Sequence, residues 1–156
     1  MLFRSFGALA RKFIDEDKRT QLQKSLIRSH AASSGEIVET EVVRAMMAVR
    51  LATLCRGLSG VQSKTAQAYA ALLNASITPV VREYGSLGCS GDLAPLSACA
   101  LAVMGEGEVI NKEGRIVDAA SALKDAGISP VELSSKEGLA LINGTDGMLE
   151  IGRAHV

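Results

Sequence analysis

The sequence contains no tryptophan, and aromatic residues of all kinds make up only 3% of its 156 positions. Its 17 lysines and arginines are balanced by 17 aspartates and glutamates, so the formal net charge is zero. Surfaces that bind nucleic acids usually combine a basic patch with aromatic side chains that stack on bases. The sequence has neither feature, which argues against nucleic acid as a partner.

Long apolar runs and a cysteine framework are missing as well. No apolar run approaches the roughly 20 residues of a membrane-spanning helix, and residues 1–14 lack the apolar core of a signal peptide. The three cysteines, Cys55, Cys89 and Cys99, are an odd number at spacings that fit neither a disulfide framework nor a zinc site. We therefore expect a cytoplasmic protein without a metal ion and without membrane contact.

The apolar residues, 47% of the chain, recur mostly at helical spacing. This pattern predicts a mainly α-helical protein, with helices at 15–29, from a cap at Thr40 to Gly57, from a cap at Ser63 to Leu73, and from Leu93 to Gly105. The period changes near 107–117, which predicts a short β-hairpin. Asp118 is expected to cap a brief helix that ends at Gly127, and Ser134 with Glu137 to form a capping box.

One of these helices is apolar on most of its circumference, which is typical of a buried helix. Val42, Met46 and Val49 share one of its faces, and Val43, Met47, Leu51 and Leu54 share another. Arg44 and Arg50 interrupt the apolar pattern. We therefore expect at least one side of this helix to meet polar groups or a partner.

The most informative stretch runs from Tyr84 to Leu96 and reads YGSLGCSGDLAPL. If the amide nitrogen of Gly91 attacks the carbonyl carbon of Cys89, a five-membered ring closes and water leaves. Loss of water from Ser90 then gives a dehydroalanine within the ring, a 4-methylidene-imidazol-5-one (MIO), which is an electrophile that needs no added cofactor. Glycine suits the attacking position because it lacks a Cβ. On these residues alone, a glycine-rich turn before a helix capped by Asp92 is an equally good interpretation.

The flanking residues decide between the two interpretations. Asp92-Leu93-Ala94-Pro95-Leu96 resembles the Asp-Leu-x-Pro-Leu of the aromatic amino acid ammonia-lyase family, whose triplet is usually Ala-Ser-Gly. Residues 141–145 match the family's Leu-Ile-Asn-Gly-Thr element. The resemblance spans Phe6 to Leu149, under a third of a typical member, and implies a fragment of the helical ammonia-lyase (fumarase/aspartase-like) fold. Cys89 departs from the usual alanine, but its side chain stays outside the reacting backbone.

The resemblance also implies roles outside the triplet. Asp92 is linked to ring formation, and Asn143 matches an asparagine near the electrophilic ring. Ser29-His30 matches the histidine ammonia-lyases of the family, whereas phenylalanine lyases resemble Phe-Leu here and tyrosine lyases His-Leu. An imidazole can exchange a hydrogen bond with the ring of a histidine substrate. The simpler interpretations are a left-handed residue at a helix C-terminus for Asn143 and a helix-end histidine with a hydrogen-bond partner for His30.

The reaction that the resemblance implies removes ammonia from L-histidine to give trans-urocanate, a step of histidine degradation. The ring would capture the substrate amine and make it a better leaving group, while the helix N-terminus after Asp92 favours electron flow onto the ring. In the family the base comes from a tyrosine-bearing loop that would lie beyond residue 156, and members form homotetramers with shared active sites. We therefore expect this chain alone to lack lyase activity. The alternatives are a phenylalanine or tyrosine ammonia-lyase, an aminomutase, or a non-catalytic helical oligomerisation module.

Both ends of the chain depart from the family pattern. Phe6-Gly7 matches only the tail of the family's Tyr-Gly-x-Asn-Thr-Gly-Phe-Gly segment, so its acid/base tyrosine has no counterpart. Residues 150–156 break the apolar pattern expected of a helix there and match the translation of a sequencing adapter, GAG ATC GGA AGA GCA CAC GTC. We therefore expect residues 1–149 to be a partial MIO-forming domain truncated at both ends. The tail is expected to be non-native, with His155 outside the site.

Overall fold

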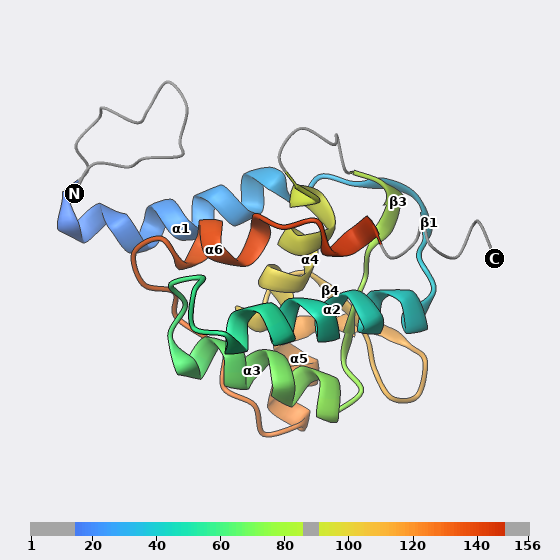
Figure 1. The fold of residues 1–156 in the computed structure, drawn as a ribbon. Coiled ribbons are helices and arrows are strands. Elements are labelled where there is room, and N and C mark those ends of the chain that lie inside the picture. Colours follow the sequence, from blue (N-terminus) through green and yellow to red (C-terminus); the bar gives the residue numbers. More distant parts are fainter. Residues whose placement is uncertain (1–14, 86–90, 149–156) are drawn as a thin grey trace.

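A computed structural model of the chain describes residues 15–85 and 91–148, and Figure 1 shows how their helices are arranged. The helices in these ranges are α1 (Glu16–His30), α2 (Thr40–Cys55), α3 (Ser63–Asn74), α4 (Leu93–Val103), α5 (Ala119–Asp125), α6 (Glu137–Ile142) and the short 3-10 helix η2 (Asp146–Met148). The prediction of a mainly helical fold is confirmed. Neither Gly57 nor Gly105 belongs to a helix: α2 ends at Cys55 and α4 at Val103.

Two small antiparallel sheets accompany the helices. The hairpin predicted near 107–117 is present as β4 (Glu108–Ile110) and β5 (Ile116–Asp118), and β2 (Thr78–Pro79) pairs with β4 on its other edge. The second sheet, β1 (Ser34–Ile37) with β3 (Arg82–Tyr84), was not predicted. Most of the residues of β1 are exposed, so no alternation of apolar residues marks it in the sequence. This sheet joins the segment after α1 to the segment that leads into the reactive loop.

Helix α4 lies at the centre of the fold, with α1 and α6 packed against it on one side and α3 on another (Figure 1). Its side chains are small or apolar, and Leu96, Cys99, Ala100 and Val103 are completely buried. Small residues let neighbouring helices approach closely, so one helix can contact three others. The first turn of α4 is therefore fixed by the core of the molecule, and this turn directly follows the reactive triplet.

The helix starts only partly follow the predicted caps. Asp118 caps α5 as predicted, since its Oδ2 accepts a hydrogen bond of 3.1 Å from Ser121 N. Thr40 and Ser63 do not cap α2 and α3: each is the first residue of its helix, after Glu39 and Gln62 respectively. A residue inside the first turn cannot fold its side chain back onto the free N–H groups, which is the reason these two predictions are wrong.

The predicted capping box is half formed. Glu137 Oε2 accepts a hydrogen bond of 2.6 Å from Ser134 N, as the pattern requires, but α6 begins at Glu137 itself. The other oxygen of Glu137 accepts from Gln62 N at 2.8 Å and from Thr65 Oγ1 at 2.7 Å. Glu137 therefore stabilises the start of α3 as well, a role that belongs to no local pattern.

Helix α2 is buried along one face and not on most of its circumference, so the prediction is wrong for the opposite face. The residues exposed there are mostly small: Ala45, Ala48, Val49, Ala52 and Thr53. Both arginines that interrupt its apolar pattern meet polar groups. Arg44 donates a hydrogen bond of 3.0 Å to the carbonyl of Leu73, at the end of α3. Arg50 is only 3% exposed, and its hydrogen-bond partners lie between residues 140 and 146.

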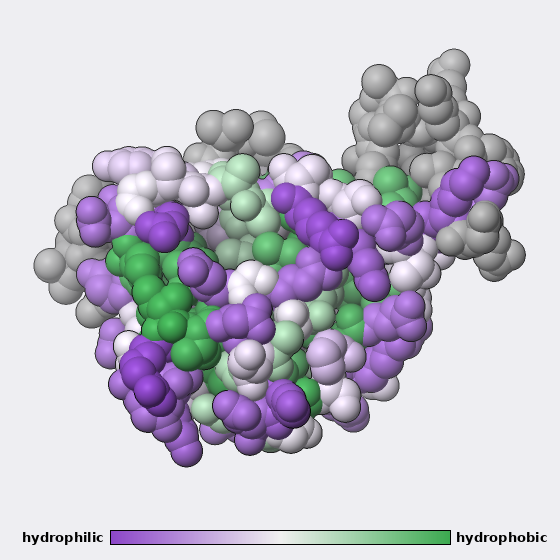
Figure 2. All heavy atoms as spheres, turned by 180° about the vertical axis from the view of Figure 1, so that it is seen from behind, coloured by the Kyte–Doolittle hydropathy of each residue, from purple (hydrophilic) through white to green (hydrophobic). Residues whose placement is uncertain are grey.

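Figure 2 shows that hydrophilic side chains cover much of one face, with a strip of apolar side chains reaching the surface between them. The large apolar side chains exposed in the described ranges are Val49, Leu58, Tyr84 and Ile116. Within those ranges no helix combines the length and the apolar character needed to cross a bilayer.

Candidate functional site

The predicted reactive triplet lies in the connection between β3, which ends at Tyr84, and α4, which begins at Leu93. Cys89 and Ser90 lie outside the described residues. Gly91 is the member of the triplet whose position the structure gives, and Asp92 follows it as the residue before α4.

Gly91 occupies a position that only glycine fits. It is buried, and its φ of +151° lies in a region that residues with a Cβ rarely adopt. A Cβ at this position would lie 2.5 Å from the carbonyl oxygen of Gly144 and 2.9 Å from its nitrogen. Both neighbours are backbone atoms, which cannot rotate away. The backbone of Gly144 is therefore packed directly against Gly91.

Two hydrogen bonds join Asp92 to the segment of residues 143–147, called the clamp segment below. The backbone N–H of Asp92 donates to the carbonyl of Gly144 at 2.6 Å, and Asp92 Oδ2 accepts from the N–H of Gly147 at 2.8 Å. The prediction that the Asp92 side chain caps α4 is wrong, because it makes no hydrogen bond to the first turn of the helix. Its carboxylate instead holds the clamp segment beside the triplet.

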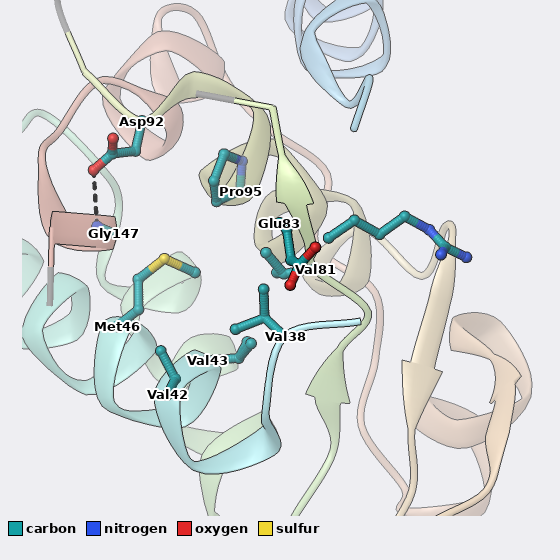
Figure 3. Close-up of a pocket in the computed structure, with 10 residues that line it drawn as sticks. Val38, Val42, Val43, Met46, Val81, Glu83, Asp92, Pro95 and Gly147 are labelled. Carbon is teal, nitrogen blue, oxygen red and sulfur yellow. Dashed lines mark hydrogen bonds between the residues drawn. The ribbon is translucent and has the colours of Figure 1, made fainter. Parts of the chain in front are cut away.

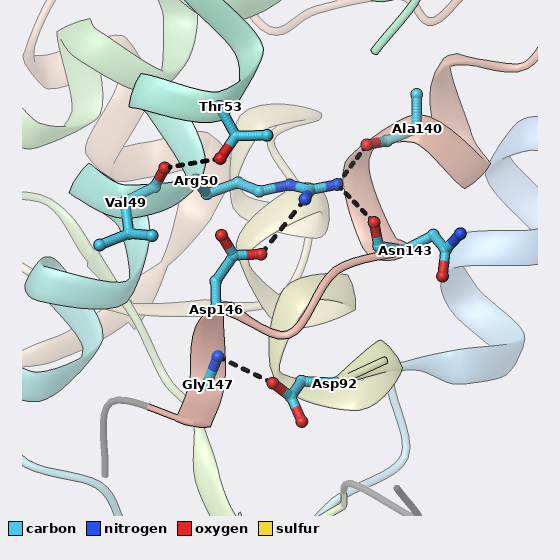
Figure 4. Close-up of polar contacts among 8 residues, drawn as sticks. All are labelled: Val49, Arg50, Thr53, Asp92, Ala140, Asn143, Asp146 and Gly147. Carbon is cyan, nitrogen blue, oxygen red and sulfur yellow. Dashed lines mark hydrogen bonds and ion pairs between the residues drawn. The ribbon is translucent and has the colours of Figure 1, made fainter. Parts of the chain in front are cut away.

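A buried arginine organises the other side of the clamp segment (Figure 4). Arg50 reaches from α2 and donates from Nη1 to Asp146 Oδ2 at 3.2 Å; the two side chains are 4% and 7% exposed. Its Nη2 donates to the carbonyl of Asn143 at 3.1 Å and to the carbonyl of Ala140 at the end of α6. One guanidinium thus binds the last turn of α6 and both ends of the turn that carries Gly144.

Asn143 lies at the C-terminus of α6, but not in the left-handed conformation of the simpler interpretation. Its φ of −91° and ψ of 98° are extended, and its side chain is exposed. In Figure 4 the Asn143 amide points away from Arg50, while its carbonyl faces the guanidinium. The backbone of Asn143 is thus fixed, and its amide group is accessible to other groups.

Ser29 and His30 are the last two residues of α1. His30 Nδ1 lies 2.8 Å from the carbonyl oxygen of Leu26 and 3.0 Å from Ser29 Oγ, and Ser29 Oγ donates to the same carbonyl at 2.8 Å. His30 is therefore a helix-end histidine with hydrogen-bond partners on its own helix. These contacts leave Nε2 as the nitrogen directed away from the helix backbone.

The end of α1 lies near the start of the reactive loop. A Cβ on Gly85 would lie 2.9 Å from the Cβ atoms of both Ser33 and Ala94, so these three positions are in close contact. Ser33 follows His30 by three residues, and Ala94 belongs to the first turn of α4. Three segments next to predicted site residues are thereby brought together: the connection that follows α1, the entry to the loop and the exit from it.

A small cavity borders this region (Figure 3). It has a volume of about 60 Å³, and Asp92, Pro95 and Gly147 line the side nearest the triplet. The remaining lining residues are mostly apolar and come from the approach to α2, from α2, and from β3 with the residue before it: Val38, Val42, Val43, Met46, Val81, Arg82 and Glu83. Sites for small molecules usually enclose ~300–1,000 Å³. This cavity holds water-sized groups and not an amino acid.

The two tyrosines of the described ranges lie in different surroundings. Tyr69 is completely buried in the core, and burial raises its pKa well above the usual value. Burial likewise raises the pKa of the neighbouring Cys99 thiol to about 12. Tyr84 is 69% exposed on β3. The interpretation of Tyr69 as a packing residue is confirmed.

Sequence reasoning did not include Arg50 and Asp146 among the site residues. The available signal was an arginine within an apolar helix, which predicted a polar contact without its partner. The partner lies 96 residues further along the chain, so no local pattern links the two. Among the described residues, no group of three histidine, cysteine, aspartate or glutamate side chains is arranged to hold a metal ion.

The geometry defines a class of protein: a helical fold in which a glycine with positive φ and an acidic residue precede a central buried helix and are packed against an Asn-Gly-Thr turn. A family model described as aromatic amino acid lyase matches residues 3–156. The chain belongs to the aromatic amino acid lyase family.

Individual relatives and solved structures show which members of the family the chain is similar to. The chain is 60% identical over 144 residues to a histidine ammonia-lyase of Streptomyces avermitilis, covering 92% of this chain and 28% of the relative. It is 46% identical to a MIO-dependent tyrosine 2,3-aminomutase of Streptomyces globisporus, covering 94% of this chain and 27% of that protein. Among solved structures, a histidine ammonia-lyase from Trypanosoma cruzi matches with a TM-score of 0.82 and 41% identity, over 90% of this chain and 27% of that one. The chain thus spans less than a third of the length of these relatives.

Proposed function

We propose that this chain is the ring-forming part of a histidine ammonia-lyase, which removes ammonia from L-histidine to give trans-urocanate. We use the term complete lyase for a full-length enzyme of this kind that contains residues 1–149. The observation that carries the proposal is the close packing of Gly144 against Gly91, in a chain 60% identical to a histidine ammonia-lyase. We propose that residues 150–156 are not part of the native protein.

The residues around Gly91 fit an MIO group formed from Cys89, Ser90 and Gly91. Ring closure needs a third residue whose backbone bends in a way that a Cβ would prevent, and Gly91 meets this requirement at φ +151°. Asp92 supports ring formation, because its backbone and carboxylate are both fixed directly after the triplet. When formed, the ring supplies an electrophile for the amino group of the substrate. The N-terminus of α4, two residues beyond Gly91, contributes a partial positive charge beside it.

Ser29, His30 and Asn143 are the residues that we propose for binding L-histidine. The Leu26 carbonyl can only accept a hydrogen bond, so a neutral His30 carries its proton on Nδ1. Its Nε2 is then an acceptor, suited to the N–H of a substrate imidazole. The exposed amide of Asn143 offers both a donor and an acceptor to polar groups of the substrate.

The rest of the active site is proposed to come from other parts of a homotetramer. The cavity beside Asp92 has a volume of about 60 Å³ and does not hold an amino acid. The base that removes the β-proton is expected from the remaining length of the complete lyase. Exposed apolar side chains such as Leu58, at 85% exposure, supply surface for subunit contacts. The free and exposed Cys55 fits the reducing environment of the cytoplasm, which we propose as the location.

The proposal is tested with the complete lyase, by intact mass and by urocanate absorbance. We expect a mass two water molecules below the translated mass, and absorbance that rises when L-histidine is added. A Ser90→Ala variant is the control, because without the hydroxyl no dehydroalanine forms; it should keep at least one of the two waters and lose activity. The 156-residue chain alone should produce no urocanate. A folded complete lyase that keeps its full translated mass contradicts the proposal.

The similarity to a tyrosine aminomutase supports one alternative, the same chemistry on another amino acid. Ser29-His30 favours histidine, and a substrate panel with L-histidine, L-phenylalanine and L-tyrosine distinguishes the two. Product analysis separates elimination from migration of the amino group. A complete protein that shows no mass loss and no reaction with borohydride would instead be a non-catalytic helical oligomerisation module.

A further inference from the structure

We propose that Arg50 and Asp146 are positioning residues for ring formation: their buried ion pair fixes the clamp segment against Gly91 and Asp92. The ion pair thereby determines the position of the Gly91 nitrogen when it attacks the carbonyl carbon of Cys89. The inference rests on the proposed function, because it concerns the formation of the same ring. It assigns a role to two residues on elements far from the triplet in sequence.

Arg50 holds the clamp segment in place. The guanidinium binds the carboxylate of Asp146 at 3.2 Å and the carbonyl of Asn143 at 3.1 Å, on either side of Gly144 (Figure 4). It also binds the carbonyl of Ala140, which belongs to α6. A planar guanidinium offers its donors in a fixed fork, so three acceptors bound at once fix the turn in one geometry.

Gly144 itself is closely packed on two sides. A Cβ at this position would overlap Asp146 Oδ2 and Arg50 Nη1, so the ion pair lies directly against the α-carbon of Gly144. The opposite edge of the same residue, its carbonyl and its nitrogen, lies against Gly91. Gly144 is therefore held between the ion pair and the triplet. A displacement of the ion pair would be passed to Gly91 through a single residue.

The position of the Gly91 nitrogen matters because of the way the ring closes. The Gly91 nitrogen must form a bond to the Cys89 carbonyl carbon, whose oxygen leaves as water with the hydrogens of the Gly91 and Ser90 amides. A second water leaves with the Ser90 hydroxyl and its α-hydrogen, so two waters are lost in total and no oxidant is needed. The amide nitrogen is a poor nucleophile, so the rate depends on its distance and angle to the carbonyl; misplacement by about 1 Å costs ~100-fold in a positioned reaction.

The nature of the ion pair favours positioning over simple stabilisation. Two charges that are almost completely buried lose their hydration, and this loss largely cancels their attraction, so such a pair is weak evidence for stability alone. What a buried pair supplies is a defined geometry of the groups that it joins. Here those groups are the residues on both sides of Gly144.

The test uses the complete lyase with Arg50→Met, Arg50→Lys and Asp146→Asn. Arg115→Met is the matched control, because Arg115 belongs to an exposed ion pair in the hairpin, 4.0 Å from Glu113. The readout is the fraction of folded protein that has lost two waters, followed by intact mass against time after synthesis. We expect ring formation to slow about 10- to 100-fold in Arg50→Met. Asp146→Asn and Arg50→Lys should be slowed less, because each keeps part of the contact.

A second readout separates positioning from a general loss of structure. Activity per molecule should fall in proportion to the ring-containing fraction. A purely structural role predicts a lower melting temperature with an unchanged rate of ring formation in the folded protein.

The inference is overturned if folded Arg50→Met forms the ring as fast as Arg115→Met. If Arg50→Met does not fold, Asp146→Asn decides by the same criterion, because it keeps the shape of the side chain and one acceptor for Arg50. The unsubstituted complete lyase tells the two proposals apart. If it keeps its full translated mass, the proposed function fails; if it loses two waters and all variants match it, only the present inference fails.

Discussion

The β4–β5 hairpin with α5 and the clamp segment with Gly91 are both held by polar side-chain contacts, but the contacts differ in kind. In the hairpin, Asn111 Oδ1 accepts from the N–H groups of Glu113 and Arg115 at 3.1 and 2.9 Å, and Asp118 caps the helix that follows. Each partner lies within four residues. In the clamp segment, Gly147 binds a residue 55 positions away and Asp146 one that is 96 positions away.

The two regions also differ in burial. The polar partners in the hairpin are exposed or partly exposed, whereas Arg50 and Asp146 are buried. A polar group that loses its partner in the hairpin can bind water instead. A group that loses its partner in the clamp segment stays desolvated, and the cost is much larger. The regions therefore differ in tolerance: the polar contacts of the hairpin can be lost without leaving a buried charge unpaired, and those of Arg50 and Asp146 cannot.

The largest effect should come from Arg50→Met in the clamp segment. The substitution leaves the carboxylate of Asp146 buried without its cation, and breaking a buried pair in this way costs about 3–5 kcal/mol. We expect a loss of this size in the free energy of unfolding of this chain, measured by urea titration with far-UV circular dichroism. A loss as small as that of Arg115→Met in the hairpin would show that the two regions do not differ.

Glu137→Gln tests a second long-range cluster and should have the next largest effect. Glu137 accepts hydrogen bonds from two backbone N–H groups and from Thr65, and an amide in its place would point a donor at one of those donors. We expect a loss of about 2–3 kcal/mol, the cost of a buried donor without an acceptor. Glu113→Gln in the exposed turn is the control and should leave the urea midpoint nearly unchanged.

The same carboxylate should make stability depend on pH. Burial alone would raise the pKa of Glu137, but the hydrogen bonds from Gln62, Ser134 and Thr65 outweigh it, so the folded pKa lies below the usual value. Such a group stabilises the fold fully above its unfolded pKa of about 4.3. The contribution is lost as the pH falls through the lower, folded pKa. The unfolding free energy should therefore fall more steeply below about pH 4.3 in the unsubstituted chain than in Glu137→Gln.

Asp118→Ala tests the local side of the comparison. Removal of the cap leaves Ser121 N without its side-chain acceptor at the exposed start of α5, and the loss of an N-cap costs about 1 kcal/mol. The change in urea midpoint should be well below that of Arg50→Met, and the ring-containing fraction of the complete lyase should not change. An effect of Asp118→Ala on ring formation would contradict the separation of the two regions.

The smallest effect is expected for Arg28→Met, which separates burial from distance along the sequence. Arg28 binds Glu106 through two hydrogen bonds of 2.7 and 2.8 Å, and the partners are 78 residues apart, yet the pair is exposed. The contact with Arg28 lowers the pKa of Glu106, but solvent screens exposed pairs and their contribution is small. A urea midpoint shift as large as that of Arg50→Met would mean that separation in sequence, rather than burial, sets the cost.

The sequence was a good guide to local structure and a poor one to the partners of buried charges. The helices, the hairpin and the Asp118 cap follow from spacing and from residues within one turn of each other. The β1–β3 pair was missed because its exposed residues carry no alternating pattern. The position of Asp92 predicts a helix cap, but its carboxylate instead accepts a hydrogen bond from the N–H of Gly147.

By itself, the sequence determined the helical class, the family resemblance and the identity of the residues proposed to form the ring, because these depend on residue types and their spacing. Only the tertiary structure decided which groups press on Gly91 and which cation neutralises Asp146. The physical reason is that a buried charge needs an opposite charge or hydrogen-bond partner nearby in space, and that partner can come from any part of the sequence. In this chain the partner of Asp146 is Arg50 of α2, which lies 96 residues earlier in the sequence.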